Sequence, residues 1–96
     1  MERNIGTLKK LCVKYNVLKL YIFGSVLSDK FHEDSDIDFL VTFDKVDLEE
    51  YADNYFDFKF SLADLFNRKI DLLEEKVIKN PYLKQSIDNT KELLYG

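Results

Sequence analysis

The chain has 96 residues, of which 46% are hydrophobic and 15% aromatic, a composition that favours one packed domain over residues 1–96 and excludes a disordered protein. Its 14 basic and 18 acidic side chains give a formal net charge of −4, which makes it a poor candidate for binding nucleic acid through the phosphates. Cys12 is the single cysteine, so an intrachain disulfide and a cysteine-based metal site are excluded.

The N-terminal part predicts a helix followed by a strand. Apolar residues at helical spacing form one face of the helix: Ile5, Leu8, Leu11, Cys12 and Tyr15. The helix is expected to end near Asn16, because asparagine tolerates the left-handed backbone conformation of a helix end. The strand that follows is expected to stop at Gly24. Its side chains alternate between two faces, one of which carries Leu18, Leu20 and Ile22.

The next stretch contains the most informative pattern. Gly24 and Ser25 end the strand abruptly, and after ten more residues Asp36 and Asp38 open a second strand. Glycine accepts a sharp turn, and a serine hydroxyl with the free N–H groups of a helical turn forms a seat for a phosphate. The two carboxylates share one face of the strand, where they repel each other unless a cation lies between them. The opposite face is apolar: Ile37, Phe39, Val41 and Phe43.

The longest helix is expected to begin after Asp47, with Glu50 three residues later in a capping-box pattern. Its core face carries Leu48, Tyr51, Ala52, Tyr55, Phe58, Leu62, Leu65 and Phe66. A second apolar stripe carries Phe56, Phe60 and Ala63. Two interpretations of this stripe remain open: the same small domain covers it, or another protein docks on it.

A third strand and a last helix complete the predicted fold. The strand runs through Ile70 and Leu72, with Asp71 at its start. Asparagine as a cap and proline at the first helical position predict that a helix starts at Asn80 and Pro81. The inward face of this helix is Leu83, Ile87, Thr90 and Leu94. These elements predict an α+β fold, with a mixed three-stranded sheet packed with helices.

The Gly-Ser pair, the fixed gap and the Asp-x-Asp of residues 36–38 resemble the signature of the DNA polymerase β-like nucleotidyltransferases. The shortness of the chain narrows the resemblance to the minimal nucleotidyltransferases (MNT), the antitoxins of MNT–HEPN toxin–antitoxin pairs, over about residues 17–96. The resemblance implies the polymerase β-like fold and an Mg²⁺-dependent enzyme that transfers AMP from ATP to a tyrosine hydroxyl with release of pyrophosphate. The implied partners are ATP and a cognate HEPN RNase toxin, in a hetero-oligomer.

This chemistry suggests a role for each residue of the motif. Two Mg²⁺ ions suit nucleotidyl transfer, and magnesium prefers carboxylate and phosphate oxygens, so Asp36 and Asp38 are the expected metal ligands. By resemblance, Asp71 would be the third catalytic carboxylate and metal ligand. Gly24 would let the backbone approach the β- and γ-phosphates, and Ser25 would donate hydrogen bonds to them.

The turn after the Gly-Ser pair departs from the family pattern. Relatives usually carry basic residues there to hold the triphosphate, whereas this chain has Val26, Leu27 and Ser28, and its first cation is Lys30. Either Lys30 reaches the phosphates, or the site binds nucleotide weakly without help. Two other functions therefore remain open: an inactive or weak antitoxin that neutralises its toxin by direct binding, and a subunit of a small-molecule nucleotidyltransferase.

Other sites and locations are disfavoured. A calcium loop built on Asp34, Asp36 and Asp38 fails because Phe39 stands where glycine is needed and Lys45 where glutamate is needed. His32 is the only histidine, so a zinc site has no partner for it. Since no apolar run is long enough for a membrane span or a signal peptide, a cytoplasmic location is the expectation.

Overall fold

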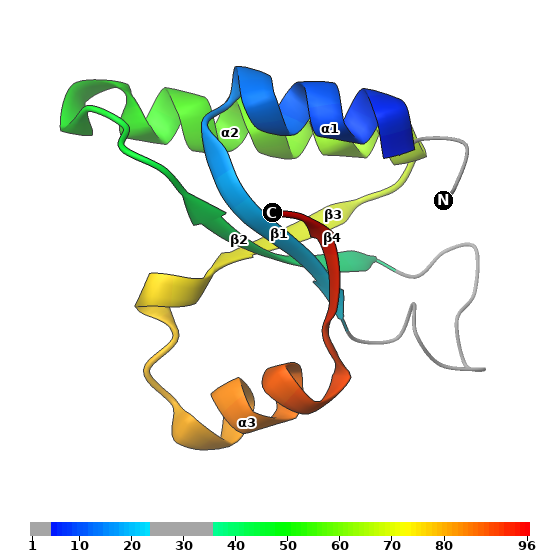
Figure 1. Ribbon diagram of the computed structural model, residues 1–96, viewed down its shortest axis with the longest axis vertical. Helices are drawn as coiled ribbons and strands as arrows, with labels where there is room; N and C mark the ends of the chain where they lie inside the picture. Colours follow the sequence, from blue (N-terminus) through cyan, green and yellow to red (C-terminus); the bar gives the residue numbers. More distant parts are fainter. Residues whose placement is uncertain (1–4, 24–35) are drawn as a thin grey trace.

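The computed structural model describes residues 5–23 and 36–96, and these form three layers (Figure 1). The elements in chain order are α1 (Ile5–Lys14), β1 (Val17–Phe23), β2 (Ile37–Phe43), α2 (Leu48–Phe66), β3 (Ile70–Glu74), the 3₁₀ turn η3 (Glu75–Val77), α3 (Pro81–Thr90) and β4 (Glu92–Tyr95). Helices α1 and α2 contact each other and cover one face of the sheet, and α3 lies on the other side. No helix among the described residues is long and apolar enough to cross a membrane.

The sheet is mixed, as predicted, but it has four strands in the order β3-β2-β1-β4, so the prediction of three strands was wrong. The last helix ends at Thr90, and Leu94, which was expected on its inward face, lies in β4. This strand pairs antiparallel with β1, and Tyr21 lies opposite Leu93. Pairing satisfies the backbone N–H and C=O groups along the free edge of β1, which outweighs the helical spacing of a single leucine.

Helix α1 and strand β1 confirm most of their predicted features. Leu8 and Cys12 are buried, and burial raises the pKa of the Cys12 thiol to about 12, as for an inert core residue. Asn16 ends the helix with a φ of 60°. The register of β1 shifts between Val17 and Lys19, so Val17 takes the buried position. Leu18, predicted on the same face as the buried Leu20 and Ile22, is instead 49% exposed.

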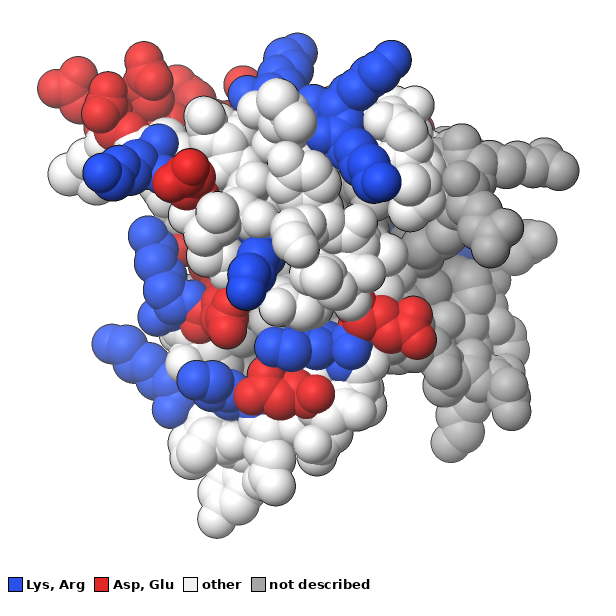
Figure 2. Space-filling view, viewed as in Figure 1, with Lys and Arg blue, Asp and Glu red and all other residues white. Residues whose placement is uncertain are grey.

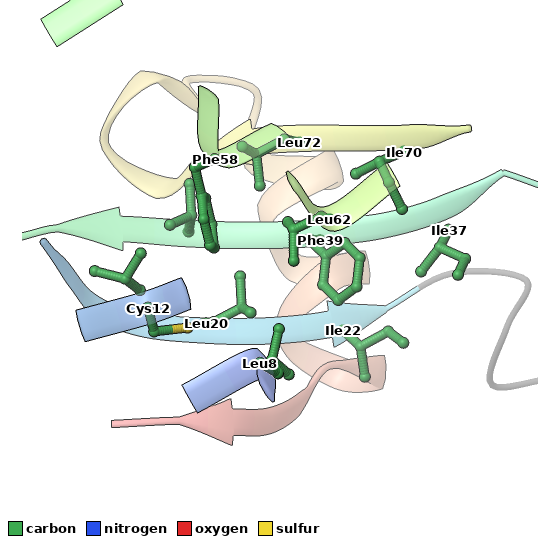
Figure 3. Packing of buried hydrophobic residues seen from close by; sticks show 12 residues of the cluster. Leu8, Cys12, Leu20, Ile22, Ile37, Phe39, Phe58, Leu62, Ile70 and Leu72 are labelled. Atoms are coloured by element: carbon green, nitrogen blue, oxygen red, sulfur yellow. The ribbon is translucent and has the colours of Figure 1, made fainter. Parts of the chain in front are cut away.

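The core lies between the sheet and the helix pair α1–α2. It includes Leu8 and Cys12 from α1, Phe58 and Leu62 from α2, and Leu20, Ile22, Ile37, Phe39, Ile70 and Leu72 from the strands (Figure 3). The apolar face predicted for β2 is thus confirmed. Alternation along β2 turns Leu40 and Asp38 to the opposite face, where Leu40 is also buried.

Helices α2 and α3 differ in how their N-terminal ends are capped. Asp47 occupies the cap position of α2, and its carbonyl accepts from the Glu50 N–H at 2.9 Å, but its side chain makes no capping hydrogen bond, so the predicted capping box does not form. Asn80 does cap α3, because its side-chain oxygen accepts from the N–H of Tyr82 at 2.9 Å and of Leu83 at 3.3 Å.

Only one of the residues predicted on the inward face of α3 is buried. Ile87 is 2% exposed, whereas Leu83 is 44% exposed and Thr90 is exposed as well. The hydroxyl of Thr90 donates to the backbone carbonyl of Ser86 within the helix, at 3.0 Å. Helix α3 therefore covers only a part of the sheet and leaves most of its own surface in water.

Candidate active site

The sheet register brings two of the predicted carboxylates together. Strands β2 and β3 run parallel as neighbours, and Asp38 lies directly opposite Asp71. Neighbouring strands lie about 4.8 Å apart, and residues in register project to the same face. Asp36 precedes the first residue of β2 and stands two positions before Asp38, on the same side of the chain. All three carboxylates thus belong to one end of the β2–β3 pair.

The local electrostatics agree with this geometry. The pKa of Asp38 is raised above the usual aspartate value, first by burial and then by the negative charges of Asp71 and Asp36. Asp38 is half-buried, whereas Asp36 and Asp71 are exposed. Each neighbouring carboxylate therefore makes ionisation of Asp38 less favourable, and a bound cation would reverse that effect.

The donor set fits magnesium, although the carboxylates do not form a closed cage. Among the described residues, no three His, Cys, Asp or Glu side chains are grouped closely enough to hold a metal by themselves. Magnesium rarely needs such a cage, because it keeps waters and takes one or two carboxylates together with substrate phosphates. Asp36, Asp38 and Asp71 carry oxygen atoms of the kind that such a site would use.

Tyr55 of α2 is a neighbour of the site that the sequence pattern assigned only to core packing. Its hydroxyl donates a hydrogen bond to the backbone carbonyl of Leu72, the residue after Asp71. Burial, followed by the charge of Asp71, raises the pKa of Tyr55, so the hydroxyl keeps its proton for this bond. A contact between residues 17 positions apart leaves no local signal in a sequence, so only the fold reveals it.

The phosphate-binding candidates cannot be placed in the same way. Gly24, Ser25 and Lys30 lie outside the described residues. Phe23, the last residue of β1, is opposite Asp38, so the described part of this strand ends beside the carboxylates. The Gly24–Ser25 pair follows it directly in the sequence.

Comparison with known proteins gives three concordant results. The family model described as "Polymerase beta, Nucleotidyltransferase" matches residues 6–96. A Methanocaldococcus jannaschii protein named "Putative protein adenylyltransferase MJ0128" is 40% identical over 87 residues, which cover 91% of this chain and 84% of the relative.

Solved structures share the fold. A toxin–antitoxin structure with AMP-PNP matches at a TM-score of 0.72 and 24% identity, covering 97% of this chain and 73% of the other. The structure of a tri-AMPylated HEPN toxin from Shewanella oneidensis in complex with its MNT antitoxin matches at a TM-score of 0.67 and 21% identity, covering 99% and 71%. At these identities the likeness shows the fold alone. The family match and the relative show more: the chain belongs to the polymerase β nucleotidyltransferase family, and it is a nucleotidyltransferase.

Proposed function

We propose that this nucleotidyltransferase is an antitoxin that transfers AMP from ATP to a tyrosine hydroxyl of a cognate HEPN toxin and releases pyrophosphate. The observation that carries the proposal is the register of Asp38 with Asp71, with Asp36 two residues away. A relative named as a protein adenylyltransferase and a fold shared with an MNT antitoxin beside an AMPylated HEPN toxin support the choice of group and acceptor.

The reaction divides two tasks among the three carboxylates. The tyrosine oxygen attacks the α-phosphorus of ATP, a new P–O bond forms, and the bond from the α-phosphorus to the bridging oxygen of pyrophosphate breaks. Asp71 takes the proton of the attacking hydroxyl, while Asp36 and Asp38 would hold magnesium. Bound magnesium supplies positive charge against the charge that develops on the attacking and leaving oxygens.

The phosphates need further contacts, which we assign to the turn after β1. Gly24 allows close approach of the backbone, Ser25 donates hydrogen bonds, and Lys30 supplies the positive charge that relatives carry closer to the Gly-Ser pair.

A second candidate function follows from that same turn. Val26, Leu27 and Ser28 stand where the family usually has basic residues, so the chain could neutralise a toxin by binding it without transferring a nucleotide. The two candidate functions predict different products from the same mixture: a HEPN protein that carries AMP, or an unmodified HEPN protein in a complex.

The test uses the product of the neighbouring gene, expected to be a HEPN protein, mixed with the chain, ATP and Mg²⁺ and analysed by intact mass spectrometry. We expect the HEPN protein to gain the mass of one or more AMP groups, and no gain with Asp38→Asn or with EDTA. A stable complex without any gain in mass would favour the binding-only candidate. A genome that encodes no such neighbour would count against a toxin acceptor.

A further inference from the structure

The second apolar stripe of α2 is not covered by the rest of the described chain. Phe56 is 50% exposed and Phe60 is 63% exposed. Their rings stack with centroids 6.4 Å apart and an interplanar angle of 28°, so they form one continuous aromatic surface. Of the two interpretations of this stripe, burial within the domain is therefore wrong for both phenylalanines.

A cleft adjoins this surface and lies beside β3, the strand that carries Asp71. It has a volume of about 420 Å³ and lies between α2 and β3, with Tyr51, Tyr55, Phe56, Leu72 and Val77 among its lining residues. Phe56 belongs to both the cleft and the aromatic surface. Its ring contacts that of Tyr55 edge-on, with the two ring centroids 5.1 Å apart. Leu72 belongs to the strand that carries Asp71, but the two side chains project to opposite faces of β3, so the cleft lies on the α2 side of that strand and the carboxylates on the other.

The edge strand beside the cleft favours one mode of binding. β3 is an edge strand of the described sheet, and such edges accept an added strand through free backbone groups. At Leu72 that route is less favourable, because its carbonyl already accepts a hydrogen bond from the hydroxyl of Tyr55. This favours insertion of an apolar side chain into the cleft as the mode of binding.

The charges around the stripe define the partner further. Asp53 and Asp57 each stand three residues before a phenylalanine of the stripe, and Asp64 stands four residues after Phe60, so all three flank it on the helix surface. All three aspartates are exposed, and Figure 2 shows acidic side chains gathered over the start of α2. A partner with basic residues beside an apolar anchor complements this surface.

We propose that the aromatic surface and the cleft are the docking site of the protein acceptor, which inserts an apolar side chain beside Phe56 and places basic residues against Asp53 and Asp57. The proposal rests on the proposed function in that the substrate is a protein. A second copy of the chain is a poorer occupant, because a two-fold interface would place like-charged aspartates against each other.

The first test measures binding of the HEPN protein to the intact chain by calorimetry, without ATP or Mg²⁺. Phe60→Ala and Phe56→Ala should each weaken binding about tenfold or more, since exposed aromatic residues at the centre of an interface dominate its affinity. Tyr82→Ala is the matched control: it removes an aromatic side chain that is 82% exposed on α3, and binding should not change. Thermal melts of each variant check that it is folded.

The second test addresses charge. Asp53→Lys and Asp57→Lys should weaken the same complex, and raising the salt concentration should weaken the wild-type complex but affect these variants less. Glu92→Lys makes the same charge change on β4 and should leave binding unaltered.

Each outcome decides for or against the proposal. Equal affinity of wild type, Phe60→Ala and Asp57→Lys, or a HEPN protein that does not bind at all, would overturn it. A wild-type dimer that Phe60→Ala converts to a monomer in sedimentation experiments would assign the surface to a second copy instead. Catalysis is not needed for these measurements. If the variants bind the HEPN protein more weakly but the wild type transfers no AMP, the docking site is supported and the proposed reaction is rejected.

Discussion

The side chain of Asp38 is expected to affect both metal binding and the stability of the fold. Burial and two neighbouring carboxylates raise its pKa, so its ionised form is disfavoured in the folded protein. We predict that Asp38→Asn abolishes AMP transfer, because it removes ligand charge, and leaves the fold at least as stable as wild type at neutral pH without metal. Transfer assays and denaturant melts on the same protein measure both effects, and near-normal transfer would reject the two-metal assignment.

The pH dependence of that comparison follows from the direction of the shift. A carboxyl whose folded pKa lies above its unfolded value binds more protons in the folded state, so stability falls as pH rises through this range. The repulsion acts above the folded pKa and is removed below it. The stability advantage of Asp38→Asn should therefore be largest near neutral pH and disappear under acidic conditions.

Tyr55 and Tyr51 provide a matched pair for testing a positioning role. Tyr55→Phe removes the hydroxyl that holds the Leu72 carbonyl, and we predict a loss of about 1 kcal/mol in the free energy of unfolding together with slower transfer, since Asp71 precedes this anchor. Tyr51 carries a buried hydroxyl without a hydrogen-bond partner among the described residues, so Tyr51→Phe should be neutral or stabilising.

Kinetics separate positioning from general destabilisation. Tyr55→Phe should lower the maximal rate of transfer by a larger factor than it lowers HEPN affinity measured without ATP, because the variant keeps the ring that lines the cleft. If Tyr55→Phe and Tyr51→Phe transfer AMP equally well, Tyr55 has a structural role only.

At the scale of elements, the helices and the central strands could be predicted from local patterns. The caps at Asn16 and Asn80 and the apolar face of β2 depend on residues close in sequence, and the structure confirms them. The short strand β4 was missed, because four residues carry too little alternation to oppose a helical spacing. The bulge that exposes Leu18 depends on pairing with β2, which the sequence of β1 does not contain.

The candidate site divides along the same line. Asp36 and Asp38 form a local pattern, and their shared face follows from strand geometry alone. The proximity of Asp71 requires the parallel pairing of β2 with β3, and the contact of Tyr55 requires the packing of α2 on that edge. Both are properties of the tertiary fold. The family resemblance suggested the role of Asp71, whereas nothing in the sequence indicated the contact of Tyr55.

The two helix starts predict different costs of cap removal. Asn80→Ala should lower the free energy of unfolding by about 1 kcal/mol, because it leaves the N–H groups of Tyr82 and Leu83 without their acceptor. Asp47→Ala should cost much less, since the Asp47 side chain makes no capping hydrogen bond. Denaturant unfolding of both variants provides the comparison, and equal losses would contradict the assigned caps.

On the scale of the whole molecule, the sheet separates two functions. Its face toward α1 and α2 supplies the apolar core, and its other face carries the half-buried Asp38 and the exposed Asp71. Changes to the carboxylates are therefore expected to leave the core packing intact. The proposed docking surface lies beside β3, the strand that carries Asp71. This arrangement lets metal, nucleotide and protein binding be tested separately.

Metal binding should be visible as stability of the whole domain. Mg²⁺ bound at the proposed site would relieve the repulsion among Asp36, Asp38 and Asp71, and a ligand that binds only the folded state at 100 times its Kd adds about 2.7 kcal/mol. In a domain of this size each 1 kcal/mol corresponds to about 4–8 °C in Tm. We predict that Mg²⁺ raises the Tm of wild type, that adding ATP raises it further, and that EDTA reverses both shifts.

The controls for this measurement distinguish a specific site from general screening of an acidic protein. Sodium chloride at equal ionic strength should give a smaller shift, and Glu92→Gln, which removes an exposed charge on β4, should keep the full Mg²⁺ response. Asp38→Asn should lose it, because both the ligand and the repulsion that the metal relieves are gone. An Mg²⁺ shift of equal size in wild type and Asp38→Asn would mean that the three carboxylates do not form the metal site.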